Sequence, residues 1–172
     1  MGPDINSKWR CILFGWLVLA AGAAAASDAR TALEPIRGKA RAMDGDSLRV
    51  GRHHVRLWGI DAPEFDQSCD RDGRAWDCGR AARAALASRI DGRIVECVPR
   101  DRDAYRRLVS VCSLAGHPLN EWMVREGWAV EYRRYSGGAY AKAERQARKA
   151  GRGVWSGRFE RPDRYRQRHR AR

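Results

Sequence analysis

Residues 43–64 read MDGDSLRVGRHHVRLWGIDAPE, and this stretch decides how the rest of the chain is interpreted. Two β-rich runs, residues 47–50 and 54–60, are joined through a Gly-Arg pair, which indicates a β-hairpin. Pro63 ends the second run, because a proline nitrogen cannot donate to a strand ladder. Four carboxylates stand at the ends of this predicted hairpin: Asp44, Asp46, Asp61 and Glu64.

These carboxylates predict a site for a hard cation. Oxygen ligands without thiolate or imidazole partners suit Ca²⁺ or Mg²⁺ and do not suit zinc or copper. Asp46 precedes the first hairpin strand and Asp61 follows the second, so antiparallel pairing would bring them together. Taken alone, residues 44–46 are an ordinary turn and residues 61–64 a strand terminator. Their coincidence across one hairpin favours the cation site.

Arg56 lies inside the second strand, between Val55 and Leu57. A guanidinium in an apolar strand usually has a fixed anionic partner, and the alternative is a side chain that only extends its head group into solvent. Next to a cation site, a suitable partner is a substrate phosphate held by two hydrogen bonds.

The whole chain is strongly basic, which indicates a polyanionic partner. Its 172 residues fit one domain with a single core. They include 34 Lys and Arg against 21 Asp and Glu, a formal net charge of +13. Nucleic acid is the first candidate partner and an anionic membrane surface the second. Solubility alone rarely needs so large an excess.

Residues 1–26 are predicted to be a secretory signal peptide, so the protein is expected to be secreted or periplasmic. Lys8 and Arg10 flank a short apolar run that ends in Ala-Ala-Ala-Ser. The run is marginal for a membrane span, which needs about 20 residues, and an uncleaved anchor is the alternative. Residues 27–35 are expected to be a polar lead-in.

Beyond this segment four cysteines remain, and an even number in an exported protein favours two disulfides. Zinc is the competing interpretation, but there is no C-x-x-C pair and no histidine at ligand spacing. Cys69 and Cys78 bracket a polar loop. Cys97 and Cys112 fall at cross-strand positions if their two strands pair antiparallel.

Five strands and three helices are expected within residues 36–156, which predicts an α+β fold: a small β-barrel with helices packed on it. The expected strands are residues 36–43, 47–50, 54–60, 93–98 and 108–114. The expected helices are residues 80–90, 118–126 and 140–150. Residues 65–79 are expected to be a loop. The arginine-dense residues 157–172 are predicted to be a disordered tail or an accessory anion-binding arm.

Five segments of the chain resemble the thermonuclease, or staphylococcal nuclease-like, domain family. In order along residues 36–156 they are Asp44-Gly45-Asp46-Ser47, residues 56–64, Asp103-Ala104-Tyr105-Arg106-Arg107, residues 119–129 and Gly153-Val154-Trp155. The resemblance implies a five-stranded OB-fold β-barrel with three helices. It also implies a Ca²⁺-dependent phosphodiesterase that acts on DNA and RNA, breaks the bond to the 5′ oxygen and leaves a 3′-phosphate end.

The same resemblance implies which residues hold the metal. Asp46 and Asp61 resemble the side-chain calcium ligands, and Ala62 resembles the residue that gives a backbone carbonyl. Asp44 resembles a residue that supports these ligands.

It also implies the catalytic residues. Glu64 resembles the general base that activates the attacking water, while Arg56 and Arg107 resemble the pair that binds the phosphate and stabilises the transition state. These roles agree with the chemistry, because attack on an anionic diester requires charge neutralisation by a metal and guanidinium groups.

Tyr105, Tyr132 and Tyr135 are predicted to bind substrate by stacking on sugar or base, a sequence-tolerant grip on single-stranded or frayed nucleic acid. Packing in the core is the alternative for these tyrosines, and it is favoured for Trp128.

The chain departs from the family pattern at two positions. Arg106 replaces a usual glycine in a tight turn, where its side chain could shift the loop that carries Arg107. Ser47 replaces a usual threonine and keeps the hydroxyl. The pairing Cys69–Cys78 and Cys97–Cys112 is expected for an exported relative.

Two competing functions have to be weighed against a nuclease. One is a catalytically inactive OB-fold module that binds nucleic acid in the cell envelope, although no acid, base or ligand of the family pattern is lost here. The other is a basic envelope protein held on a membrane, which leaves the acidic hairpin unexplained.

Overall fold

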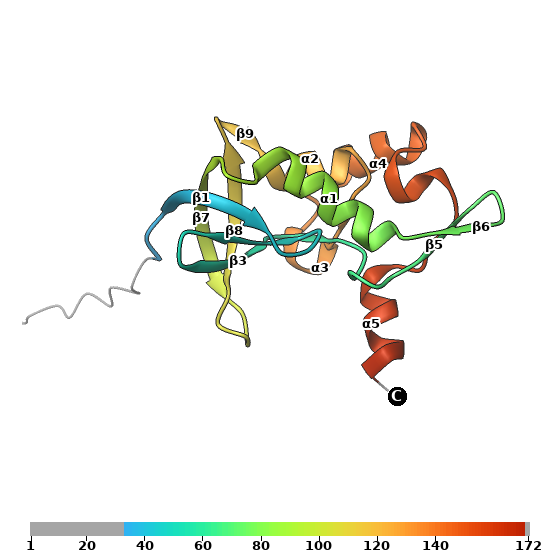
Figure 1. Cartoon of the computed structure of the whole chain (residues 1–172), viewed down its shortest axis with the longest axis horizontal. Coiled ribbons are helices and arrows are strands. Elements are labelled where there is room, and N and C mark those ends of the chain that lie inside the picture. Colours follow the sequence, from blue (N-terminus) through green and yellow to red (C-terminus); the bar gives the residue numbers. More distant parts are fainter. Residues whose placement is uncertain (1–32, 171–172) are drawn as a thin grey trace, which may run out of the picture. The chain divides into compact units, whose positions relative to one another are not determined.

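A closed five-stranded barrel is the centre of the fold in the computed structural model, which describes residues 33–170. Its strands are β1 (Ile36–Ala42), β2 (Ser47–Val50), β3 (His53–Leu57), β7 (Ile94–Arg102) and β8 (Leu108–Leu114). They follow the order β3-β2-β1-β7-β8, and a parallel pairing of β3 with β8 closes the barrel. The predicted α+β barrel with helices is therefore confirmed (Figure 1).

Alternating side chains of these strands fill the barrel, as expected for strands with one face on the core. In β3, Val55 and Leu57 are fully buried, whereas Arg56 between them is half-buried and His54 before them is exposed. The interior is lined by Leu48, Val50, Val55, Leu57, Val95 and Leu108.

The second hairpin strand was predicted over residues 54–60, and its predicted end is wrong. β3 stops at Leu57, and Gly59 then takes a left-handed backbone with φ of 73°. A Cβ on Gly59 would lie 2.9 Å from the Cβ of Ser136, so the chain turns here against a later segment. Ile60–Asp61 forms a separate strand, β4, which pairs with β10 (Val130–Glu131). Asp61 thus reaches the site from a second, two-stranded sheet.

Part of the segment expected to be a loop is a small hairpin. β5 (Cys69–Arg71) pairs with β6 (Arg74–Trp76). Its two turn residues, Asp72 and Gly73, both have positive φ, which is the tight-turn conformation that Asp-Gly favours. The Asp-Gly pair was a hairpin signal, but the strands on either side are too short and polar to show a strand pattern.

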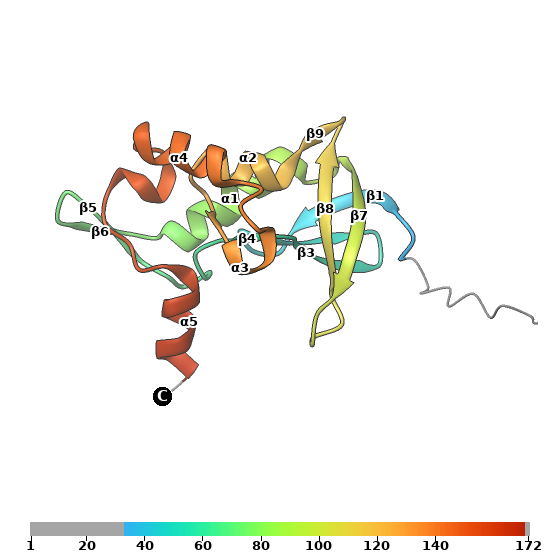
Figure 2. The ribbon, with the colours of Figure 1, turned by 180° about the vertical axis from the view of Figure 1, so that it is seen from behind.

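Helices cover the barrel on one side (Figure 2). The helical elements are α1 (Cys78–Ile90), α2 (Leu119–Arg125), α3 (Arg133–Ser136), α4 (Ala141–Lys149) and the 3₁₀ helix η1 (Gly153–Ser156), and a two-residue strand, β9 (His117–Pro118), precedes α2. α1 buries Ala82, Leu86 and Ile90 and packs against β1. α2 packs against β8 and α4. Three of these helices correspond to the predicted ones, with ends shifted by one or two residues.

Both predicted disulfides are present. Cys97 and Cys112 face each other directly in the β7–β8 register, and their sulfurs are bonded. Cys69 and Cys78 join the β5–β6 hairpin to the start of α1. Two disulfides indicate an oxidising compartment. The predicted signal peptide lies outside the described residues, and no helix within them is long and apolar enough to cross a membrane.

The arginine-dense tail is not disordered where the structure describes it. Residues Pro162–Arg170 form a helix, α5, which extends away from the other helices (Figures 1 and 2). Pro162 at the first helical position followed by Asp163 is a helix-start signal, because proline lacks an N–H that a helix leaves unpaired there and an acid suits the helix N-terminus.

Candidate active site

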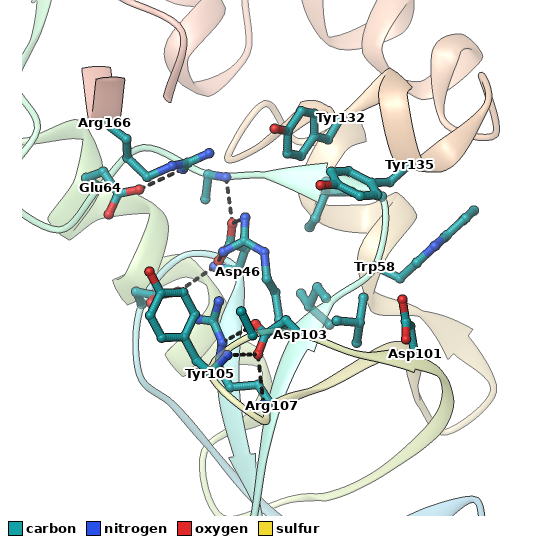
Figure 3. Close-up of a pocket in the computed structure, with 18 of the residues that line it drawn as sticks. Asp46, Trp58, Glu64, Asp101, Asp103, Tyr105, Arg107, Tyr132, Tyr135 and Arg166 are labelled. Atoms are coloured by element: carbon teal, nitrogen blue, oxygen red, sulfur yellow. Dashed lines mark hydrogen bonds and ion pairs between the residues drawn. The ribbon is translucent and has the colours of Figure 1, made fainter. Parts of the chain in front are cut away.

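An open pocket of about 700 Å³ collects side chains from distant parts of the chain (Figure 3). Its walls come from the turn before β2, from β3 and the segment after it, from the β7–β8 turn, from the segment after β10 and from α5. The predicted site residues that line it are Asp46, Arg56, Ala62, Glu64, Tyr105, Arg107, Tyr132 and Tyr135.

The turn before β2 is built by its own side chains. The Asp44 carboxylate accepts hydrogen bonds from the backbone N–H groups of Asp46 (2.9 Å) and Ser47 (2.6 Å) and from the Ser47 hydroxyl (2.9 Å). Such local bonds make Asp an effective turn residue. Gly45 is required by packing, because a Cβ there would lie 2.6 Å from the Cβ of Ala62. The turn thereby presents Asp46 to the pocket.

Asp46 is a buried carboxylate, only 4% exposed. Burial raises its pKa to about 7; the Arg56 guanidinium opposes this rise, and the nearby carboxylates of Asp44 and Asp61 add to it. Its oxygen Oδ2 accepts the backbone N–H of Ala62 at 3.1 Å, which ties the turn to the segment after β4.

Arg56 joins the two aspartates. Its Nη1 donates to Oδ1 of Asp46 at 3.1 Å and its Nη2 donates to Oδ1 of Asp61 at 2.8 Å. The expectation of an anionic partner is met here by the protein's own carboxylates. Burial alone would lower the pKa of Arg56, but Asp46 and Asp61 raise it above its usual value. Arg56, Asp46 and Asp61 therefore form one charged cluster.

Glu64 stands at the mouth of the pocket on a loop with a fixed backbone. The buried side chain of Gln67 accepts the Glu64 N–H at 3.2 Å, and the Gln67 N–H donates to the Glu64 carbonyl at 2.9 Å. The first turn of α1 packs closely against the Glu64 carbonyl, because a Cβ on Gly79 would lie 1.7 Å from the carbonyl oxygen. The loop is thus held from both sides.

Arg107 approaches the cluster from the β7–β8 turn. The Asp103 carboxylate accepts its Nε at 2.7 Å and its backbone N–H at 2.9 Å. Its Nη1 donates to the Ser47 hydroxyl at 3.3 Å, beside Asp46. Arg106 takes a left-handed backbone with φ of 64°, so the turn keeps a glycine-like conformation despite the side chain. Within this turn, the Asp103 side chain holds Arg107 in place.

The three tyrosines are all on the pocket wall. Tyr105 is 70% and Tyr135 57% exposed, so core packing is excluded for these two. Tyr132 is half-buried and meets Tyr135 edge to face, with ring centroids 4.8 Å apart. Trp128 packs against the core, as expected.

Arg166 on α5 is a site residue that the sequence patterns did not reveal. Its Nη1 and Nη2 donate to Oδ1 and Oδ2 of Asp61, each at 2.8 Å, and Nη1 also donates to Oε1 of Glu64 at 2.7 Å. Figure 3 shows the arginine beside Glu64 on one wall of the pocket. A contact across more than 100 positions leaves no trace in local sequence spacing.

The donor set fits a hard cation. Asp46 and Asp61 are buried carboxylates, and Glu64 adds a third carboxylate at the pocket edge. Oxygen atoms alone suit Ca²⁺ or Mg²⁺. Within residues 33–170, however, no three acidic, histidine or cysteine side chains are grouped as a ready metal site. Arg56 and Arg166 interleave with the carboxylates instead.

Comparison with known proteins identifies a family. Residues 54–157, more than half of the chain, match the family described as "Staphylococcal nuclease homologue". The succinoglycan biosynthesis protein ExoI of Rhizobium meliloti is 36% identical over 127 residues, which cover 72% of this chain and 66% of that protein.

Two further relatives carry nuclease names. A probable endonuclease LCL3 of Schizophyllum commune is 36% identical over 135 residues, covering 67% of this chain and 45% of the relative. A probable staphylococcal-like nuclease CAN1 of rice is 30% identical over 113 residues, covering 65% of this chain and 31% of the relative. The chain therefore spans less than half of either of these two proteins.

Proposed function

Because this chain belongs to the staphylococcal nuclease family, we propose that it hydrolyses phosphodiester bonds of DNA and RNA. The observation that carries the proposal is one pocket lined by two carboxylates (Asp46, Glu64) and two arginines (Arg56, Arg107) from separate segments. A third carboxylate, Asp61, is buried behind the pocket wall and bonded to Arg56. A pocket with a base, a cation site and fixed guanidinium groups has the parts that hydrolysis of an anionic diester requires.

The proposed cofactor is Ca²⁺, held by the side chains of Asp46 and Asp61 and the backbone carbonyl of Ala62. When bound there, the cation would supply positive charge that offsets the charge of the phosphate and of the buried carboxylates. Asp44 supports this arrangement, because its hydrogen bonds fix the turn that presents Asp46.

Glu64 is the proposed general base. A carboxylate at the edge of an open pocket can accept a proton from the attacking water as the water adds to phosphorus. Arg56 and Arg107 donate hydrogen bonds to the phosphate oxygens, whose negative charge grows in the transition state. The bond to the 5′ oxygen breaks, and the phosphate remains on the 3′ end.

The substrate is proposed to be single-stranded or frayed nucleic acid. Tyr105 and Tyr135 offer exposed aromatic rings on the pocket wall, and Tyr132 lies beside Tyr135. Aromatic rings stack on any base and so bind without sequence preference. The formal charge of +13 adds attraction to a polyanion.

Export fits the same proposal. Two disulfides and a basic, apolar N-terminal segment support a secreted or periplasmic nuclease that meets nucleic acid outside the cytoplasm.

Digestion of single-stranded oligonucleotides with Ca²⁺ and with excess chelator tests this function. We expect cleavage with Ca²⁺, none with chelator, and products that carry 3′-phosphate and 5′-hydroxyl ends. Binding without cleavage under both conditions would instead identify a nucleic-acid-binding module. Cleavage that survives the chelator would show that the cation assignment is wrong.

A further inference from the structure

Helix α5 has almost no apolar surface with which to pack. Its sequence is PDRYRQRHR, and Pro162 is the residue of it that is buried. Isolated helices shorter than about 12 residues are marginal in water, so a nine-residue helix of this composition depends on its contacts. Figures 1 and 2 show that it extends away from the helices that cover the barrel. Its position is therefore set by a few polar contacts.

The strongest of these contacts are to the carboxylates of Asp61 and Glu64. Arg166 makes three short hydrogen bonds to Asp61 and Glu64, and its side chain is only 22% exposed. Although burial lowers the pKa of Arg166, the bonds to the two carboxylates raise it above its usual value. Arg168 adds an ion pair to Glu160 at 2.6 Å.

These bonds use the oxygen lone pairs that a cation would need. Oδ1 of Asp61 accepts from both Arg56 and Arg166, which fills its two acceptor positions, and Oδ2 accepts from Arg166 as well. Oε1 of Glu64 accepts from the same guanidinium. A cation on Asp61 would also meet a like charge at close range.

The charges of the cluster point the same way. Asp46, Asp61 and Glu64 carry three negative charges in their ionised forms, and Arg56 supplies one positive charge. Arg166 supplies a second positive charge beside Asp61 and Glu64, where a divalent cation would supply two. Arg166 thus takes the place of part of the cation's charge.

We propose that α5 is a displaceable arm whose Arg166 guanidinium competes with the divalent cation for Asp61 and Glu64. Metal binding and docking of α5 are then coupled, and each weakens the other. While Arg166 is seated, Oε1 of Glu64 is held in an ion pair, which makes Glu64 a weaker base. The inference rests on the proposed function for the nature of the cation site.

The segment that leads into α5, residues 158–160, is held more firmly than the helix itself. Asp70 and Arg158 exchange two backbone hydrogen bonds of 2.8 and 2.9 Å, and the buried Gln67 donates to the carbonyl of Glu160 at 2.7 Å. Displacement is therefore expected to move residues 162–170 while residues up to 160 stay in place.

Calorimetric titration of Ca²⁺ alone into the full-length protein tests the competition. Arg166→Ala is expected to bind Ca²⁺ at least about tenfold more tightly than the wild type. Arg164→Ala is the matched control, because it removes an exposed arginine from the same helix; its affinity should stay within about twofold. Equal or weaker binding by Arg166→Ala would overturn the proposal, since Arg166 would then be neutral toward the cation or support it.

Hydrogen exchange on the wild-type protein gives a second test that needs no variant. Saturating Ca²⁺ should speed amide exchange in residues 162–170 relative to the chelated protein, and unchanged exchange would overturn the proposal. Cleavage assays on the same samples distinguish a failure of the α5 proposal from a failure of the proposed nuclease function. If wild type and variant both cleave with Ca²⁺ but bind it equally, only the arm is refuted. If neither binds Ca²⁺ nor cleaves, the proposed function fails and the arm with it.

Discussion

Asp46 is the residue whose ionisation controls the proposed cation site. A carboxylate that is 4% exposed and has a pKa near 7 is mostly protonated just below neutral pH. In the metal-free protein this raised pKa lowers stability as pH rises from about 4 to 7, because the folded chain holds a proton that the unfolded chain has released. A bound cation would remove that cost by replacing the proton.

Ca²⁺ affinity should therefore depend on pH. At pH 6 about nine in ten Asp46 side chains hold a proton that must leave before the carboxylate can bind a cation. We expect the affinity measured by calorimetry to rise about tenfold from pH 6 to pH 8, with about half a proton released per Ca²⁺ at pH 7. The same affinity at both pH values would contradict the expectation that the cation displaces a proton from Asp46.

Arg106 illustrates a residue in a backbone conformation that suits glycine. With φ of 64°, its Cβ is crowded against the backbone, at a cost of about 1–2 kcal/mol. Arg106→Gly should raise the free energy of unfolding by about 1 kcal/mol and leave cleavage unchanged, because Asp103 holds Arg107.

Urea denaturation measures this gain. Arg106→Ala is the control, since it removes the charge and keeps the Cβ, and its stability should stay close to that of the wild type. A loss of stability in Arg106→Gly would show that the Arg106 side chain supports the turn.

At the scale of elements, the pair β7–β8 does two things. Its turn carries Asp103 and Arg107 to the pocket, and its strands are joined by the Cys97–Cys112 disulfide, which does not line the pocket. The disulfide therefore stabilises the barrel, while the turn positions Arg107 in the site.

Removing this disulfide should reduce stability without changing the chemistry. The bond closes a separation of 15 residues, for which restriction of the unfolded chain predicts about 3 kcal/mol. We expect the Cys97→Ala, Cys112→Ala double variant to lose about that much in urea denaturation and to keep its kcat while folded. A loss below about 1 kcal/mol, or a large fall in kcat, would contradict this division of roles.

At the scale of the whole molecule, local sequence patterns predicted the strands of the barrel and the acidic hairpin, and the family resemblance predicted most residues of the pocket. β2 and the body of β3 follow from alternating apolar residues, and the hairpin brings Asp46 close to Arg56. The turn that delivers Arg107 follows from its position between two strands. Each of these features depends on residues that are near one another in the sequence or on a repeated pattern.

The features that the sequence did not predict depend on contacts between distant segments of the chain. At the break, Gly59 packs closely against Ser136, and the pairing of β4 with β10 separates Asp61 from the hairpin strand. Arg166 reaches Glu64 from the other end of the chain, and in the sequence it is one arginine among many in the tail. Such contacts follow from the folded arrangement as a whole.

The central claim is that Glu64 is the base of a phosphodiesterase. Cleavage of a single-stranded oligonucleotide under single-turnover conditions with Ca²⁺, compared between wild type and Glu64→Gln, tests it most directly. Glu121→Gln is the matched control, because that glutamate lies on α2 and does not line the pocket. We predict a rate loss of at least about 100-fold in Glu64→Gln, with oligonucleotide affinity within about twofold and the control unaffected. Cleavage by Glu64→Gln at the wild-type rate would contradict the account.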